Sequence, residues 1–241
     1  MNFENSWGNE LRSSAYARLE FPNTYHLAYR DLPEILAKHV KGDKALDFGC
    51  GTGRSARFLK GLKFEVTGVD ISEDMLGYAK ELDPAGEYLL VSNGNYSHLG
   101  EGSFDLVLSI FTFDNIPGWE NRRYILQALL RLLRPTGRLI CLDANPALYT
   151  HEWASFSTKE FPENSLAKNG ERVRISMKDV DDKRPVEDVL WTEEAYLQLF
   201  DLAGLTLEAT YKPMGRESDP YDWLNETTIA PWFIYVLKRE D

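Results

Sequence analysis

The sequence predicts an α/β fold, in which parallel strands form one sheet and helices connect them. Strand-like and helix-like segments alternate from residue 44 to about residue 143. The strand-like segments are short apolar runs bounded by Gly, Asp or Ser, which is typical of strands buried on both faces. The 241 residues carry no internal repeat and no Pro/Gly/Ser-rich linker, so we expect a single domain.

A helix ahead of the sheet is predicted over residues 24–41. Leu32, Ile35, Leu36, His39 and Val40 recur at the spacing of one helix face, so His39 is interpreted as a packed helix residue. The five strands that follow are predicted over residues 45–48, 65–69, 87–91, 104–110 and 138–142.

Two helices between these strands have clear apolar faces. Ser72 is placed to cap the first, whose apolar stripe is Met75, Leu76, Ala79 and Leu82. The second helix is predicted over residues 120–133. Its apolar face is expected to carry Tyr124, Ile125, Ala128, Leu129 and Leu132, and its other faces Arg122, Arg123, Gln127 and Arg131.

The rest of the chain completes the sheet and adds an insertion. Thr192 is expected to cap a helix and Gly204 to end it in the left-handed conformation. The inward residues of that helix are expected to be Tyr196, Leu197, Phe200 and Ala203. Strands are predicted at residues 205–211 and 232–237. Residues 144–191 alternate at 172–177 and 186–190, which indicates a small strand-containing insertion.

Charge and composition exclude several classes of protein. Lys and Arg number 27 against 38 Asp and Glu, and the net charge of -11 repels nucleic acid and anionic membranes. No apolar run approaches the roughly 18–20 residues of a membrane span, and the N-terminus lacks the pattern of a signal peptide. Two cysteines cannot form a disulfide framework, which favours a reduced, cytoplasmic compartment. No histidine or cysteine spacing typical of a metal site is present.

The most informative stretch is LDFGCGTGR at residues 46–54, between a strand and a helix. Gly49, Gly51 and Gly53 let the backbone turn tightly and approach a ligand. A dinucleotide fingerprint would need its third glycine one residue later, where Arg54 stands, which disfavours a nicotinamide-dependent oxidoreductase.

Two acidic residues specify the ligand further. Asp47 precedes the glycines and suits a positively charged group, and no P-loop lysine follows to bind phosphate. Asp70 ends the second strand, 19 residues after Gly51, where an acid can hold ribose hydroxyls. S-adenosylmethionine fits both, because it carries an ammonium, a sulfonium and a ribose but no phosphate.

Residues 45–143 resemble the class I S-adenosylmethionine-dependent methyltransferases, in particular those that act on small molecules. LDFGCGTGR at 46–54 is similar to motif I, VTGVDIS at 66–72 to motif II and FDLVLS at 104–109 to the strand-four motif. LRLLRPTGRLICL at 130–142 is similar to the helix, turn and strand that follow. The resemblance implies a Rossmann-like, doubly wound, seven-stranded sheet whose last strand is antiparallel.

The resemblance also assigns cofactor contacts. The three glycines should line the methionine part, with Asp47 acting on the ammonium directly or through water. Asp70 should hold the ribose and Ile71 should pack on the adenine. Ser109, Ile110 and Phe111, where the chain leaves strand four, should lie beside the sulfonium. After strand three the family usually has Gly-Asp, whereas this chain reads SNGNY at 92–96. Asn93 or Asn95 can accept from the adenine amino group, with Tyr96 beside them.

The sequence says less about the residues that would bind the methyl acceptor. Small-molecule members often carry histidine after strand four, whereas this chain reads FDNI at 113–116, which leaves Asp114 as a candidate base or as a helix cap. His151, in the insertion, ranks first among the candidate bases. The alternative is that it is simply a solvated loop residue. Tyr25 or Arg30, in the N-terminal lid, is expected to contact the methionine carboxylate.

Together these features divide the single domain into four parts. Residues 1–41 form a helical lid, 42–143 the cofactor core, 144–191 a substrate cap, and 192–241 a closing helix and two strands. The expected reaction is methyl transfer to an oxygen or nitrogen of a small molecule. The alternatives are a non-catalytic S-adenosylmethionine-binding regulatory module and a nucleic-acid methyltransferase. The charge and the lack of an Asn/Asp-Pro-Pro-aromatic sequence disfavour the latter. The sequence specifies no oligomeric state.

Overall fold

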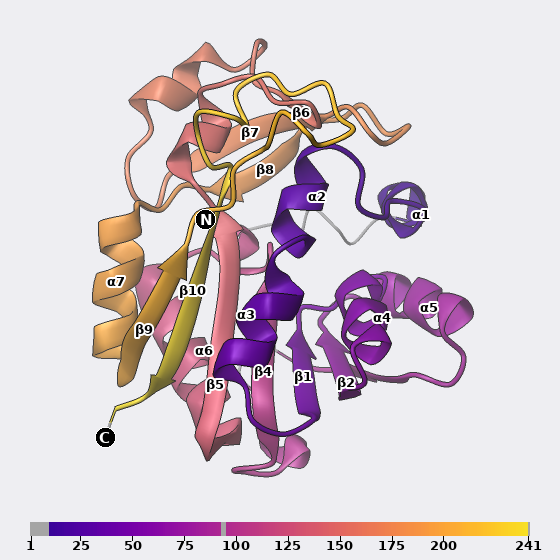
Figure 1. The fold of residues 1–241 in the computed structure, drawn as a ribbon, viewed down its shortest axis with the longest axis vertical. Helices are drawn as coiled ribbons and strands as arrows, with labels where there is room; N and C mark the ends of the chain where they lie inside the picture. The colour runs from indigo at the N-terminus through magenta and orange to yellow at the C-terminus, as the bar shows by residue number, and fades with distance from the viewer. Residues whose placement is uncertain (1–9, 93–94, 241) are drawn as a thin grey trace.

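A seven-stranded sheet forms the centre of the computed structural model, which describes residues 10–92 and 95–240 (Figure 1). The strand order is β3-β2-β1-β4-β5-β10-β9. Neighbours among β1 to β5 are parallel, and β10 is antiparallel to both β5 and β9. The predicted sheet is confirmed. Its strands are β1 (Lys44–Phe48), β2 (Glu65–Asp70), β3 (Glu87–Leu90), β4 (Phe104–Ile110), β5 (Leu133–Ala144), β9 (Leu205–Tyr211) and β10 (Trp232–Arg239).

Helices cover both faces of the sheet because alternate strand residues point to opposite sides. Ala45 of β1 packs in one hydrophobic cluster and its neighbour Leu46 in the other. The first cluster contains the apolar faces of α3 (Leu32–His39), α4 (Arg54–Gly61) and α5 (Glu73–Leu82). The second contains those of α6 (Trp119–Leu132) and α7 (Glu193–Leu202). The predicted caps are confirmed, since Ser72 and Thr192 accept from backbone amides of α5 and α7, and Gly204 has a φ of 81°.

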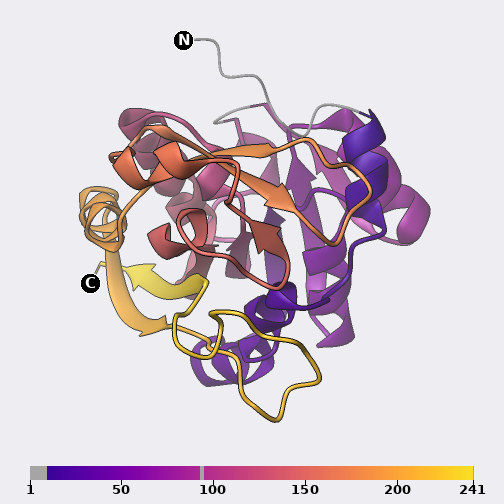
Figure 2. The same cartoon turned by 90° about the horizontal axis from the view of Figure 1, so that it is seen from above.

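The insertion forms a separate small sheet above the carboxyl ends of the parallel strands (Figures 1 and 2). Its order is β6-β7-β8, antiparallel throughout, and it is accompanied by short 3-10 helices. The predicted strand-containing insertion is therefore confirmed. The elements are η3 (Pro146–Tyr149), β6 (Phe156–Ser157), η4 (Pro162–Leu166), β7 (Arg172–Met177) and β8 (Val186–Val189).

Two further segments lie at the same end of the sheet. One is the N-terminal pair α1 (Glu10–Ala17) and α2 (Thr24–Tyr29), and the other is the long connection over residues 212–231 (Figure 2). Fully buried Glu226 joins them to the insertion, because its Oε1 accepts from Thr24 Oγ1 at 2.6 Å and from the Ala154 amide at 2.7 Å. We refer to α1, α2, the insertion and this connection together as the cover.

The predicted helix over residues 24–41 is wrong in one respect, because two helices occupy this range. α2 ends at Tyr29, and α3 begins at Leu32 with Pro33 in its first turn. Proline lacks the amide hydrogen that a continuous helix would need and disfavours helical conformation in the residue before it. The chain therefore changes direction between the two helices, which leaves α2 in the cover and α3 against the sheet.

The predicted faces of two helices also need correction. On α6, Arg122 is fully buried, whereas Tyr124 of the expected apolar face is 55% exposed and Leu126 is buried in its place. On α7, Leu197 is 36% exposed, and Leu199 packs inward. Arg122 is stable in the interior because its Nε donates to the Ile116 carbonyl at 2.6 Å and its guanidinium lies 4.6 Å from the centre of the Trp191 ring.

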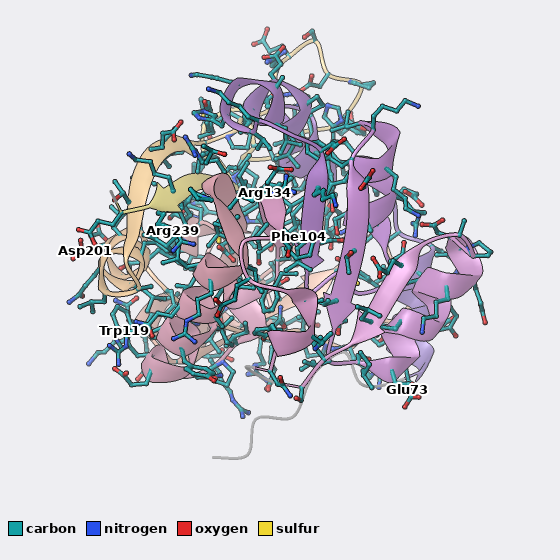
Figure 3. The ribbon with its side chains drawn as sticks, turned by 90° about the horizontal axis from the view of Figure 1, so that it is seen from below. Glu73, Phe104, Trp119, Arg134, Asp201 and Arg239 are labelled. Atoms are coloured by element: carbon teal, nitrogen blue, oxygen red, sulfur yellow. The ribbon has the colours of Figure 1, made fainter. Side chains whose placement is uncertain are left out.

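The opposite end of the molecule carries structural ion pairs and helix caps. Figure 3 shows Arg134 and Arg239 there. Arg134 bonds both carboxylate oxygens of Asp105 at 2.8 and 2.7 Å. Arg239 donates to the Leu130 and Leu133 carbonyls at the end of α6, at 2.9 and 3.1 Å. Over residues 10–92 and 95–240, no helix has both the length and the apolar character that crossing a membrane requires.

Candidate active site

A large cavity of about 360 Å³ opens at the carboxyl ends of β1, β2 and β4. The chain runs outward in opposite directions from β1 and β4 at this point, where open α/β sheets bind their ligands. The cavity is lined by the glycine loop, the end of β2, the segment that leaves β4, and two lid residues. We call this the large cavity. The lining residues used below are Tyr16, Gly49, Gly51, Arg54, Ser55, Asp70, Ile71, Tyr96, Phe111, Thr112 and Asn115.

The glycine loop is held in place by the end of β2. The amides of Gly49 and Cys50 both donate to the Val69 carbonyl, at 2.9 and 3.0 Å. Gly49 has a φ of 72°, and a Cβ there would lie 2.3 Å from Thr112 Oγ1. Only glycine adopts this positive φ readily and also avoids the overlap with Thr112. Gly53 is the residue before α4, outside the cavity lining.

Asp70 connects the loop to the cavity. Its Oδ2 accepts from the Gly51 amide at 2.8 Å and its Oδ1 from the Ser72 amide at 2.9 Å. Burial raises the pKa of this carboxyl, and the backbone amides of Ser72, Gly51 and Ile71 lower it. Each carboxylate oxygen has a further lone pair, so Asp70 can also accept from a ligand in the cavity. Ile71 lines the same cavity and is 58% exposed, as a ligand-packing residue would be.

Asp47 lies beneath the loop and is almost fully buried. Its Oδ2 accepts from Ser55 Oγ at 2.6 Å, while its Oδ1 is buried with no hydrogen-bond partner. Burial raises the pKa of this carboxyl to about 7, partly offset by the Ser55 bond. Ser55 lines the cavity and Asp47 does not, which fits an action on a ligand through an intermediate group.

Only some of the residues expected to contact the adenine and the sulfonium line the large cavity. Tyr96 lines the large cavity, whereas Asn95 is exposed outside it. Asn93 lies outside the described residues. Ser109 is fully buried in β4, has no partner for its hydroxyl and does not line the cavity. Phe111, two residues further along, does.

The expected carboxylate contacts lie elsewhere. Arg30 pairs with Asp31 at 2.8 Å and with Asp219 at 3.4 Å, and it lines neither of the two cavities described here. Tyr25 is buried between the lid and the insertion, with its hydroxyl 3.4 Å from the Met177 sulfur. The structure therefore does not bring these two residues to the large cavity.

Arg54 is a basic residue that does line the large cavity. Its guanidinium carbon lies 4.9, 5.0 and 5.5 Å from the ring centres of Tyr16, Tyr25 and Tyr29. Its Nη1 donates to the Glu20 carbonyl at 2.8 Å and its Nη2 to the Tyr16 hydroxyl at 2.7 Å. This one side chain therefore connects the glycine loop to the lid. The sequence places Arg54 directly after the glycine loop, and this position could have indicated a role in the site. In the sequence analysis it was used only as evidence against a dinucleotide motif.

A small cavity of about 50 Å³ adjoins the large one. Tyr16, Phe111 and Asn115 line both. The remaining walls come from the cover, the η2 turn (Phe113–Asn115) and the start of β10. The further lining residues are Tyr25, Asp114, Leu148, Phe156, Ile175, Met177, Val186, Asp188 and Trp232.

The two candidate bases differ in position. Asp114 lines the small cavity, but its Oδ2 accepts from the Ala144 amide at 3.0 Å and its Oδ1 from the Tyr196 hydroxyl at 3.3 Å. His151 lines neither cavity, and its Nδ1 lies 3.0 Å from Thr150 Oγ1 and 3.1 Å from the Ala147 carbonyl. Asp188, in β8, lines the small cavity and was not anticipated. No local sequence signal marks it, because only tertiary contact brings the insertion against η2.

Comparisons with known proteins agree with this architecture. Residues 46–141 match the model of a methyltransferase domain family. These residues form a class I S-adenosylmethionine-dependent methyltransferase domain. Demethylmenaquinone methyltransferase of Staphylococcus aureus is 36% identical over 110 residues, which are 44% of this chain and 44% of that protein. The chain thus matches less than half the length of such curated relatives.

Solved structures extend the likeness to the whole fold. The CcbJ methyltransferase of Streptomyces caelestis superposes with a TM-score of 0.68 at 18% identity, over 98% of this chain and 99% of that one. A methyltransferase from Clostridium acetobutylicum gives a TM-score of 0.62 at 14% identity, over 94% of each chain. At these identities the likeness concerns the fold alone.

The residues of the methyltransferase domain fit S-adenosylmethionine, its cofactor. The unpartnered buried oxygen of Asp47 can balance a cationic group beyond Ser55. Asp70 offers acceptor oxygens at the cavity wall, and the positive φ of Gly49 and Gly51 exposes backbone to a ligand.

Proposed function

We propose that this protein transfers the methyl group of S-adenosylmethionine to a nitrogen or oxygen atom of a small-molecule acceptor bound in the small cavity. The observation that carries the proposal is the shared wall between the two cavities, formed by Tyr16, Phe111 and Asn115. A group in one cavity can therefore lie against a group in the other. A volume of about 50 Å³ holds about two water-sized groups, at roughly 30 Å³ each, which suits the reacting end of a small molecule.

The residues of the chain have distinct roles in this proposal. Asp70 holds the ribose, Asp47 balances the ammonium, and Ile71 and Tyr96 border the adenine. When bound, S-adenosylmethionine supplies an electrophilic methyl group, to which an acceptor lone pair forms the new bond while the electron pair of the broken carbon–sulfur bond stays on sulfur. The protein contributes orientation and the exclusion of water.

The cover supports the second contribution. Side chains from α1, α2, the insertion and β10 line the small cavity, and most of them are apolar or aromatic. The net charge of -11 would repel a polymer such as nucleic acid, whereas a small acceptor needs no such long-range attraction. We place the reaction in the cytoplasm, because the two cysteines are buried and free.

Isotope transfer tests the proposal. Purified protein would be incubated with methyl-labelled S-adenosylmethionine and a metabolite extract, and the products would be identified by mass spectrometry. We expect label on a nitrogen or oxygen of a small metabolite, and about 10- to 100-fold slower labelling by an Asp70→Asn variant assayed below its cofactor Kd. Cofactor binding without any labelled small molecule, or label on nucleic acid instead, would overturn the proposal.

A further inference from the structure

The small cavity has an aromatic wall assembled from distant parts of the chain. Tyr25 of α2 lies 5.1 Å from Phe156 of β6, measured between ring centres, and Phe156 lies 5.7 Å from Trp232 of β10. Phe111, after β4, lies 4.6 Å from Trp232. Aromatic faces carry negative quadrupole density and attract cations, most strongly when water is excluded.

Two buried carboxylates form the polar part of this cavity. Asp114 uses both oxygens for structural hydrogen bonds, to the Ala144 amide and the Tyr196 hydroxyl. Asp188 uses Oδ2 for the Tyr149 hydroxyl at 3.1 Å, and no described donor bonds its Oδ1. Asp188 is 8% exposed. The cavity therefore contains one buried carboxylate oxygen that is available to a ligand.

Acidic groups predominate around this cavity. A third carboxyl, Asp143, is fully buried and interacts with Asp114. Arg122 is the guanidinium whose charge acts on all three carboxyls. Arg12 also acts on Asp188, but it is paired with Asp182 at 3.1 Å. Burial raises the pKa of each of the three carboxyls, and so does repulsion among them for Asp143 and Asp188. Burial thus favours their protonated forms, and an ammonium ion beside Asp188 would favour its ionised form instead.

We infer that the acceptor is a small amine, which enters as an ammonium ion against the aromatic wall and is held and deprotonated by Asp188. This inference rests on the proposed methyl transfer and specifies its substrate class. The N–H bond breaks with its electron pair left on nitrogen, and the proton passes to Asp188 Oδ1. The neutral amine then has the lone pair that methyl transfer requires.

Other acceptor classes fit this cavity less well. A carboxylate or phosphate would add negative charge beside Asp114 and Asp188, where burial makes repulsion strong. An alcohol would form the hydrogen bond to Asp188 but carries no positive charge to favour the ionised carboxylate or to contact the aromatic faces. An ammonium ion satisfies the hydrogen bond, the charge and the aromatic faces together.

Three probes of matched shape test the inference. Butylamine, 1-butanol and butanoate would be titrated by NMR into protein saturated with S-adenosylhomocysteine. We expect butylamine to bind at least about tenfold more tightly than 1-butanol, the ratio for about 1.4 kcal/mol, and butanoate not to bind measurably. Equal affinities, or tighter binding of 1-butanol or butanoate, would overturn the inference. The wild-type ranking decides this without any variant.

Two variants assign the effect to Asp188. Asp188→Asn should remove the preference for butylamine while leaving S-adenosylhomocysteine affinity unchanged. Asp201→Asn, which removes an exposed charge on α7 (Figure 3), should leave the preference intact. An unchanged preference in folded Asp188→Asn protein would contradict the role of this residue. Failure of S-adenosylhomocysteine to bind wild-type protein would instead contradict the proposed function.

Discussion

The large and small cavities share a wall but are built in different ways. The large cavity is formed mainly by segments that directly follow β1, β2 and β4, so most of its lining residues lie within a few residues of a strand end. The small cavity combines α1, α2, η2, the insertion and β10, which are far apart in the chain. Its polar group, Asp188, is 74 residues from Asp114. The large cavity is therefore a property of the sheet, and the small cavity a property of how the cover packs on it.

The largest effect is expected from Gly49→Ala, which changes the lining of the large cavity. The new Cβ would overlap the Thr112 side chain, at 2.3 Å from Oγ1, and Ala disfavours a φ of 72°. We expect loss of measurable cofactor binding by calorimetry and a lower Tm.

Gly102→Ala is the matched control for this variant. Its φ of 61° is also positive, but a Cβ there meets nothing within 4 Å. It should lose only about 1 kcal/mol of stability, from backbone conformation, and retain cofactor binding. Equal damage in both variants would show that backbone conformation, and not the contact with Thr112, makes Gly49 necessary.

Asp70→Asn is expected to weaken S-adenosylhomocysteine binding by about 10- to 100-fold. The variant loses one charged acceptor oxygen, and hydrogen bonds to charged groups contribute about 1.5–3 kcal/mol. Glu73→Gln, which removes an exposed charge three residues away on α5 (Figure 3), is the control and should bind as the wild type does. Unaltered calorimetric affinity in Asp70→Asn would refute the ribose role.

Arg54→Met is expected to separate the lid from the sheet. Its guanidinium bonds to the Glu20 carbonyl and the Tyr16 hydroxyl would be lost, together with its contacts to three tyrosine rings. Amides of residues 10–20 should exchange hydrogen faster, and cofactor affinity should fall by about three- to tenfold. Arg131→Met, on the exposed side of α6, should change neither quantity. Unchanged exchange in the lid would contradict the coupling.

Asp47→Asn is expected to act on stability, and its effect depends on pH. The folded pKa is about 7, against 3.8 ordinarily, so between pH 4 and 7 the folded protein retains a proton that the unfolded chain has lost. The stability that this group contributes is therefore present below pH 4 and is lost as the pH rises through 7.

Replacing the Asp47 carboxyl by an amide should reduce this loss of stability with rising pH. Thermal denaturation without ligand should show Asp47→Asn gaining stability relative to the wild type from pH 4 to 8. The gain at the upper end should be about 4 kcal/mol, because the pKa rises from 3.8 to about 7 and each pKa unit is worth about 1.4 kcal/mol. Asp222→Asn, at an exposed loop position, should follow the wild type at every pH. Parallel curves for Asp47→Asn and wild type would contradict the raised pKa.

The sequence predicted those elements whose signals are local. The five parallel strands, the caps at Ser72 and Thr192, and the glycine loop all depend on residues within one or two turns. Pro33 was an available signal for the break between α2 and α3, because proline within a helical pattern marks a boundary.

The missed features depend on tertiary contact. Arg122 is charged and would ordinarily face solvent, but backbone carbonyls of the segment after η2 and the Trp191 ring stabilise it inside. Buried Glu226 lies in a segment without periodicity. Asp188 lies in the alternating segment 186–190, where an acidic side chain would ordinarily be expected on the exposed face. Tyr25, Arg30 and His151 lie outside the lining of the large cavity for the same reason, since their positions depend on how the cover packs.

A crystal structure with S-adenosylhomocysteine would test most directly whether the two cavities act as one site. We expect the ribose hydroxyls to bond Asp70 in the large cavity, and the sulfur to contact the shared wall of Tyr16, Phe111 and Asn115, facing the small cavity. A ligand whose sulfur points away from that wall, or one bound without Asp70, would contradict the assignment of the small cavity to the methyl acceptor.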